Sequence, residues 1–382
     1  MPHFADYELW LCDWETDQIV SLSGPELVSL EWQHVLNGPG VWRVTLVAES
    51  GTQDRFVKHY GVKVMRDPGT GFYEEFYGIY HDPDEWLASG DVDEHYWAGS
   101  GSSAEWILDQ PLLQPMLNPN PNFERYDLWW MHGPADDVMK QMVGESMGLE
   151  AEAERQFANV TVEGNAGLGN WDCYEGYWDR LLEAMQALSG ERGNTDFRMV
   201  RVAGGFQFRT YSPFYGTDRR MGHSATPTLF SLEMENVRNP RRRGYYHAEA
   251  TVAYGGWQGG GQDRDIYTAT NADALAETPY SRREVFEDIS HVDSPDSIPA
   301  VLDQILVDQG ALVEVSFELL QTEACLYGVD WALGDLVTLE LWGGTYDMRI
   351  VEVNARISGP DDAHDEEIVG VAELWTRGEV AS

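Results

Sequence analysis

Short runs in which apolar and polar residues alternate dominate the first hundred positions and predict a β-rich segment. The runs are aromatic or β-branched, and turn residues such as Gly24-Pro25 and Gly38-Pro39-Gly40 separate them. The segment Asp67-Pro68-Gly69-Thr70-Gly71 is typical of a hairpin turn. The predicted strands cover residues 8–13, 19–22, 27–34, 41–47, 60–67 and 74–82. A short helix is predicted over 102–110, with Ser102 or Ser103 as its N-cap.

A helical period replaces the alternation in the second part of the chain, after the break Asn118-Pro119-Asn120-Pro121-Asn122. Helices are predicted over 134–147 and 171–188, where methionine and aromatic residues recur at helical spacing. A strand over 159–162 leads into a glycine-rich loop between them. Methionine and aromatic residues at helical spacing indicate a buried core rather than a cofactor pocket. The glycine-rich loop is not followed by a GxxxxGK[ST] motif, so no nucleotide site is predicted.

Alternation returns in the last part of the chain. Strands are predicted over 197–203, 205–211, 228–236, 245–254, 313–319, 336–341, 346–355 and 368–376, and helices over 283–289 and 298–308. The sequence therefore predicts a β-rich α+β protein with a β domain over 1–118, a helical α/β module over 119–200 and a second β domain with two short helices over 201–382.

Three motifs follow one another in this last part. They are Ala253-Tyr254-Gly255-Gly256-Trp257-Gln258-Gly259-Gly260-Gly261-Gln262-Asp263-Arg264, then Ser281-Arg282-Arg283-Glu284-Val285-Phe286-Glu287-Asp288, then Leu333-Gly334-Asp335-Leu336-Val337-Thr338-Leu339. The first predicts a strand that enters a glycine-rich loop and leaves it through a buried or paired arginine. The third predicts a turn at Asp335 that begins a strand. None of them carries catalytic chemistry.

This order of motifs resembles the hub-type tail proteins of tailed phages, siphovirus relatives of the trimeric hub that caps the tail tube of contractile baseplates. That family has a "GG-Q-G-G-x-x-R" segment, an "R-E-x-F" segment and an "L-G-D-x-V" turn. The corresponding residues here are Gly255, Gly256, Gly259, Gly260, Gly261, Arg264, Arg283, Glu284, Phe286, Leu333, Gly334 and Asp335. The front of the chain is similar to the family's "G-x-W-x-L-x-L" and "F-x-G-x-V" patterns at residues 40–46 and 76–80.

The resemblance implies two tail-tube-like β-barrel or sandwich domains with an inserted helical module. It also implies a structural protein without enzymatic activity or cofactor. The chain would form a homo-oligomeric ring, a trimer, at the tail tip of a virion. There it would join the tail tube to distal receptor-binding or fibre proteins and let DNA pass. Another tail ring or adaptor protein is the nearest alternative within the same class.

Composition agrees with a folded chain of two to three domains. The 382 residues are 43% hydrophobic and 12% aromatic, and no low-complexity block interrupts them. The first residues lack a secretion signal, and no run approaches the ~20 apolar residues of a membrane helix. We therefore expect assembly in a host cytoplasm, without membrane insertion.

The sequence gives only weak evidence for a catalytic or metal-binding site. Cys12, Cys173 and Cys325 are too widely spaced for a CxxC metal motif and indicate buried thiols. The histidines show no HExxH or HxH spacing, and His81 and His95 are interpreted as surface residues. The acidic residues Asp13, Asp82, Asp84 and Glu85 lack the DxDxDG loop of a calcium site. Fifteen tryptophans and eighteen tyrosines keep a carbohydrate-binding or carbohydrate-active β protein open as an alternative from a different class.

The formal net charge is −40, from 65 acidic and 25 basic residues, only three of which are lysines. Two compatible interpretations are open. An acidic, lysine-poor surface suits high salt and a halophilic host, and an acidic channel wall would repel passing DNA. Sequence-specific nucleic-acid binding is disfavoured, because the only dense basic run is Arg238-Asn239-Pro240-Arg241-Arg242-Arg243. We interpret that run as an exposed loop between strands, either plainly solvated or paired with a neighbouring subunit's carboxylates.

Overall fold

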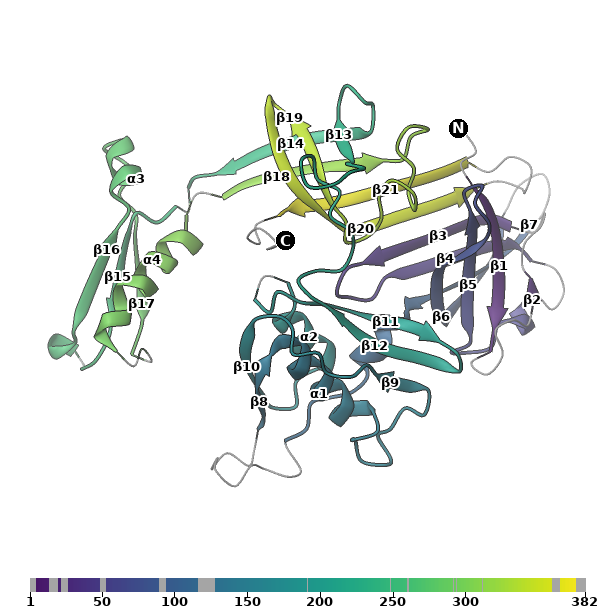
Figure 1. The fold of residues 1–382 in the computed structure, drawn as a ribbon, viewed down its shortest axis with the longest axis horizontal. Coiled ribbons are helices and arrows are strands. Elements are labelled where there is room, and N and C mark those ends of the chain that lie inside the picture. The colour runs from purple at the N-terminus through teal and green to yellow at the C-terminus, as the bar shows by residue number, and fades with distance from the viewer. Residues whose placement is uncertain are drawn as a thin grey trace. The chain divides into compact units, whose positions relative to one another are not determined.

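The computed structural model describes residues 5–13, 20–21, 27–48, 53–88, 94–115, 128–190, 192–247, 249–259, 261–290, 292, 294–310, 312–358 and 365–375. The chain divides into two compact units (Figure 1). The first comprises Met1–Arg238 with Glu318–Ser382, and the second comprises Asn239–Phe317. Each unit is considered separately below. Half of the described chain is strand, which confirms the predicted β-rich fold class.

One sheet dominates the fold, and its strands come from both ends of the sequence. In the described part of the chain it has thirteen strands, with the order β14-β18-β21-β20-β3-β4-β7-β6-β5-β1-β2 and with β13 and β19 joined beside β20. These are β1 (Asp6–Cys12), β2 (Val20–Ser21), β3 (Leu27–Val35), β4 (Val41–Val47), β5 (Gly61–Asp67), β6 (Tyr73–Ala88), β7 (Glu94–Ser103), β13 (Leu229–Ser231), β14 (Val237–Tyr245), β18 (Leu312–Leu320), β19 (Leu336–Leu341), β20 (Gly344–Ser358) and β21 (Asp365–Leu374). Most of the predicted strands are thereby confirmed.

The junction between the N-terminal and C-terminal strands is the antiparallel pair β3 and β20 (Figure 1). Their register runs without interruption from Val35 opposite Glu352 to Ser29 opposite Ser358. The hairpin between β5 and β6 was predicted from its turn residues. There the Asp67 carboxylate accepts hydrogen bonds from the backbone N–H groups of Gly69 (2.7 Å) and Gly71 (2.8 Å). Local turn chemistry thus fixes this hairpin.

A helical layer with its own apolar core lies in the same unit. Its elements are a 3-10 helix (Ala104–Asp109), β8 (Trp129–Pro134), α1 (Ala135–Met147), β9 (Val160–Val162), β10 (Trp171–Gly176), α2 (Leu181–Leu188), β11 (Asp196–Val202) and β12 (Gly205–Tyr211). Val138, Met142 and Met185 from the two helices pack with Phe197 and Phe208 from the sheet β9-β12-β11, and all are fully or almost fully buried. The interpretation of the methionine and aromatic stripe as core is confirmed.

The second unit is a three-stranded sheet covered on one face by a helix. Its elements are β15 (Val252–Gly256), β16 (Ile266–Thr270), α3 (Ala272–Glu277), β17 (Glu284–Asp288) and α4 (Ile298–Asp308), with the strand order β16-β15-β17. Ile298, Leu302 and Leu306 of α4 pack on Ala253 and Ile289. The helix predicted over 298–308 is confirmed with the same bounds.

Three predicted elements are wrong. The helix expected over 283–289 is the strand β17, which pairs in parallel with β15 and buries Val285 against the core while Phe286 faces outward. The helix expected over 171–188 contains β10 in its first third, because strand pairing with β8 outweighs the helical spacing of its aromatic residues. The arginine run belongs to the strand β14 rather than to a loop.

Two other expectations change in detail. The helix expected over 102–110 is a 3-10 helix, and the Ser103 hydroxyl donates to Glu105 instead of capping the backbone. The predicted domain boundary near residue 118 lies outside the described residues, and the one near 200 falls inside the first compact unit. The predicted third domain, 201–382, is divided between the two units.

Candidate functional site

The first two motifs meet on one face of the β15–β17 sheet. Arg264 donates from Nη2 to the Gly256 carbonyl (2.8 Å) and forms an ion pair with Asp288 (2.7 Å). Its guanidinium lies 5.6 Å from the centre of the Phe286 ring, within the range of a cation–π contact. The predicted pairing of this arginine is therefore confirmed, and its partners belong to the second motif.

Glycine at position 256 makes this arrangement possible. A Cβ atom there would lie 2.6 Å from the Arg264 Cζ and 2.7 Å from the Phe286 Cζ. Gly255 faces the opposite side of the strand, where a Cβ would lie 2.6 Å from Ile289 and 2.8 Å from Leu302. The Gly-Gly pair thus lets both faces of β15 approach their neighbours closely.

The remaining residues of these motifs have separate roles. Gly259 and Gly261 adopt φ of 89° and 61°, a left-handed conformation that favours glycine, while Gly260 lies outside the described residues. Glu284 forms an ion pair with Arg282 (2.6 Å) rather than with Arg283. The Arg283 side chain instead donates a hydrogen bond to the His247 backbone carbonyl.

The third motif ties a distant loop to the start of β19. The Asp335 carboxylate accepts from the backbone N–H of Thr217 (2.7 Å) and from Arg219 Nε (2.8 Å). Asp335 is only 2% exposed, and burial raises its pKa. Gly334 has φ of 85°, and a Cβ on it would lie 2.4 Å from the Tyr215 carbonyl oxygen. The predicted turn is confirmed, with Leu333 buried beneath it.

A buried arginine that sequence reasoning missed lies at the centre of a second network. Arg66 is fully buried, donates to the Tyr327 carbonyl (2.8 Å) and to the Tyr7 hydroxyl (3.0 Å), and pairs with Glu366 (3.2 Å). Burial alone would lower the pKa of Arg66, but its interactions with Tyr7, Tyr73 and Glu366 outweigh burial and raise it. The network joins β5 and β1 to β21 and to the segment before β19. No local motif in the sequence could have indicated these partners.

A second missed pair joins the helical layer to the large sheet. Arg349 of β20 forms a buried ion pair with Asp196 of β11. Asp196 also accepts from Asn37 Nδ2 (2.9 Å) and from the Tyr215 backbone N–H (2.7 Å). These contacts fix the position of the helical layer on the sheet within the first unit.

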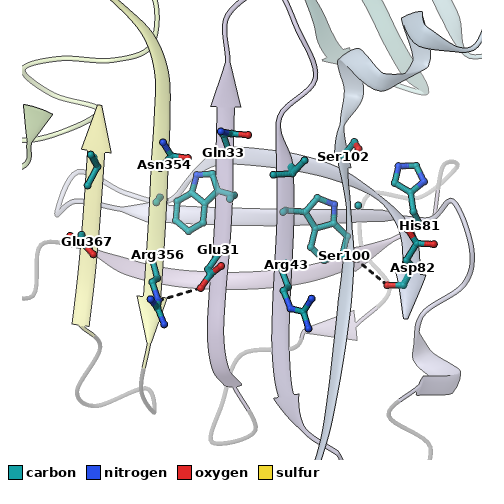
Figure 2. Close-up of a pocket in the computed structure, with 16 residues that line it drawn as sticks. Glu31, Gln33, Arg43, His81, Asp82, Ser100, Ser102, Asn354, Arg356 and Glu367 are labelled. Carbon is teal, nitrogen blue, oxygen red and sulfur yellow. Dashed lines mark hydrogen bonds and ion pairs between the residues drawn. The ribbon is translucent and has the colours of Figure 1, made fainter. Parts of the chain in front are cut away.

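A shallow trough of about 630 Å³ lies on the face of strands β21, β20, β3, β4, β7 and β6 (Figure 2). Both of its arginines are paired: Arg356 with Glu31 (3.2 Å, Figure 2), and Arg43 with Asp84 (2.9 Å). Trp32 and Trp42 border it but are each only 2% exposed. The trough therefore lacks the exposed aromatic surface on which a sugar would stack.

The candidate calcium cluster is not assembled. Asp84 pairs with Arg43, and Glu85 pairs with His95 (2.6 Å). Among the residues that the structure describes, no group of three or more His, Cys, Asp or Glu side chains is placed to hold a metal ion. No helix within the same residues is long and apolar enough to span a membrane.

Comparison with solved structures defines the class of fold. The chain is similar to a 43 kDa tail protein of prophage MuSo2 from Shewanella oneidensis, with a TM-score of 0.53 and 11% identity over 96% of this chain and 98% of that one. It is also similar to a tail protein from Neisseria meningitidis MC58, with a TM-score of 0.50 and 11% identity over 96% and 97% of the two chains. The protein thus has the fold of prophage tail proteins.

The family is identified from sequence. Residues 14–362 match the siphovirus ReqiPepy6 Gp37-like protein family, and the chain belongs to this family. A comparison with curated proteins found no match. The resemblance to siphovirus tail proteins is therefore confirmed in family and in fold.

Proposed function

We propose that the protein is a structural component of a siphovirus tail, forming the hub or ring at the tail tip. It joins the tail tube to distal receptor-binding or fibre proteins and lets DNA pass. The family and the tail-protein fold support the coarser part of this proposal. The observation that carries the finer part is the uninterrupted pairing of β3 with β20.

That pairing merges strands from both ends of the chain into one sheet. On one side of the junction lie β4, β7 and β6, and on the other lie β21, β18 and β14. A sheet of this kind ends in strands whose backbone N–H and C=O groups are open to pairing. Closure of copies into a ring would satisfy those groups, because identical subunits in a cyclic assembly present complementary edges to one another. We propose three copies, as the resemblance implies.

The polar trough face suits a surface over which DNA moves without binding. Its lining includes the neutral polar side chains of Ser100, Ser102 and Gln33 (Figure 2). The guanidinium groups of Arg43 and Arg356 are already paired with carboxylates. Paired arginines offer little attraction to phosphates, so this face would not hold a passing duplex.

Labelling of virions tests the proposed place of the chain. Gold-labelled antibodies against the second compact unit should mark the tail tip alone in electron micrographs. Label along the whole tail would indicate a tube protein, and label near but not at the tip would favour a distal ring or adaptor. If the virions carry no label and the purified chain binds polysaccharide, the proposal is overturned in favour of a carbohydrate-binding protein.

A further inference from the structure

Three adjacent arginines of β14 have no charged partner among the side chains that the structure describes. Arg241, Arg242 and Arg243 are exposed, and no described side chain forms a hydrogen bond or ion pair with their guanidinium groups. Arg243 only lies over the Tyr245 ring, 4.6 Å from its centre. Arg238, at the start of the same strand, by contrast pairs with Glu318 and with Glu367 (2.8 Å).

This lack of partners is unusual in a chain with 65 acidic and 25 basic residues. Other exposed arginines hold a carboxylate, as in Arg192 with Asp172 (2.6 Å) and Arg282 with Glu284 (2.6 Å), or a backbone carbonyl, as in Arg283 with His247. Charges and proline also protect edge strands from aggregation, and Pro240 fits that role. Carboxylates would protect the edge equally well in so acidic a protein. A basic strand instead attracts carboxylates of other molecules.

A matching acidic surface lies on α4 of the same unit. Asp303 and Asp308 are exposed, and neither forms an ion pair with a described lysine or arginine. Between them lies Val307, which is 71% exposed. Beside the arginines lies Tyr246, which is 64% exposed. Each surface therefore combines charges of one sign with an exposed apolar side chain.

We propose that Arg241 and Arg243 of one copy bind Asp303 and Asp308 of a second copy, with Tyr246 packed on Val307. The two surfaces differ, so the contact is heterologous, the type that closes identical chains into a ring. Side chains of successive strand residues point to opposite faces, so Arg241 and Arg243 share one face of β14 and Arg242 points to the other. The inference rests on the proposed ring assembly.

Charge reversal tests this contact. One variant carries Arg241→Glu, Arg242→Glu and Arg243→Glu, another carries Asp303→Arg and Asp308→Arg, and a third carries all five changes. Light scattering near physiological salt should show that each of the first two weakens assembly at least about tenfold in Kd. The third should restore the wild-type mass, because its reversed surfaces again attract each other.

The control reverses two carboxylates elsewhere in the unit, Asp273→Arg and Glu277→Arg on α3, and should leave the mass unchanged. The contact is overturned if either reversal leaves an oligomeric mass intact, or if the five-fold variant stays dissociated. If the variant with the three arginines changed to glutamate keeps the wild-type mass but no longer retards DNA in a gel, the arginines bind nucleic acid. That result would also overturn the proposed contact. A wild-type protein that is monomeric would overturn the proposed ring. A wild-type oligomer that withstands the charge reversals would overturn only the contact with α4.

Discussion

Arg349 and Asp196 form a buried ion pair although 153 positions separate them in the sequence. Arg349 lies in the middle of β20, and Arg356, seven residues later in the same strand, forms an exposed pair with Glu31. The two arginines therefore offer a matched comparison of a buried and an exposed ion pair.

Arg349→Ala should lower the free energy of unfolding by about 3–5 kcal/mol, because it leaves the Asp196 carboxylate buried without its charge partner. Arg356→Ala should cost less than about 1 kcal/mol, because solvent screens its pair. Urea denaturation followed by tryptophan fluorescence measures both. Equal losses in the two variants would show that the buried pair does not hold the helical layer on the sheet.

Gly334→Ala should destabilise the turn before β19 more than Gly343→Ala destabilises the turn between β19 and β20. Both glycines have positive φ, 85° and 75°, so both substitutions carry a conformational cost of about 1–2 kcal/mol. Only at Gly334 would the new Cβ also meet backbone, 2.4 Å from the Tyr215 carbonyl oxygen, whereas Gly343 has open space. A thermal melt should show the lower Tm for Gly334→Ala, and the reverse order would refute the close-approach argument.

How far the sequence predicts this structure depends on the range of the interaction. The Asp67 turn and the helix over 298–308 follow from local rules and were predicted correctly. The segment 283–289 was not, because its strand conformation depends on pairing with β15, some thirty residues earlier. The sequence identified the motif residues. It did not predict that Arg264, Phe286 and Asp288 meet at Gly256, and it did not predict the network around Arg66. Contacts between distant segments leave no spacing in the sequence from which they could be deduced.

Stability should fall on acidification partly through Asp136, which is 1% exposed and pairs with Lys140 (2.7 Å). Burial alone would raise the pKa of Asp136, but hydrogen bonds from Lys140 and Thr210 outweigh it and lower the pKa. A carboxyl group with a lowered folded-state pKa stabilises the fold above its unfolded pKa of about 3.9, and this contribution is lost as pH falls through the folded value.

Asp136→Asn should therefore reduce stability at pH 7 and lose less on further acidification below about pH 4 than the wild type does. Urea midpoints at several pH values measure the difference. Glu183→Gln, an exposed substitution in the first turn of α2, should keep the wild-type pH profile. An unchanged profile in Asp136→Asn would contradict a stabilising role for this carboxylate.

Salt should stabilise the chain because its net charge is −40. Raising ionic strength from 0.1 to 1 M shortens the Debye length from about 10 to about 3 Å and so screens repulsion among carboxylates. We expect the Tm to rise by about 4 °C or more. Sodium chloride and sodium sulfate matched in ionic strength should act almost alike, whereas an effect confined to sulfate would indicate strengthened apolar burial instead.

The mass of the wild-type protein in solution tests the central claim most directly. Light scattering at high and low salt should give three times the mass of one chain, as expected for a closed ring of three copies. A monomer at every salt concentration and protein concentration would contradict the account.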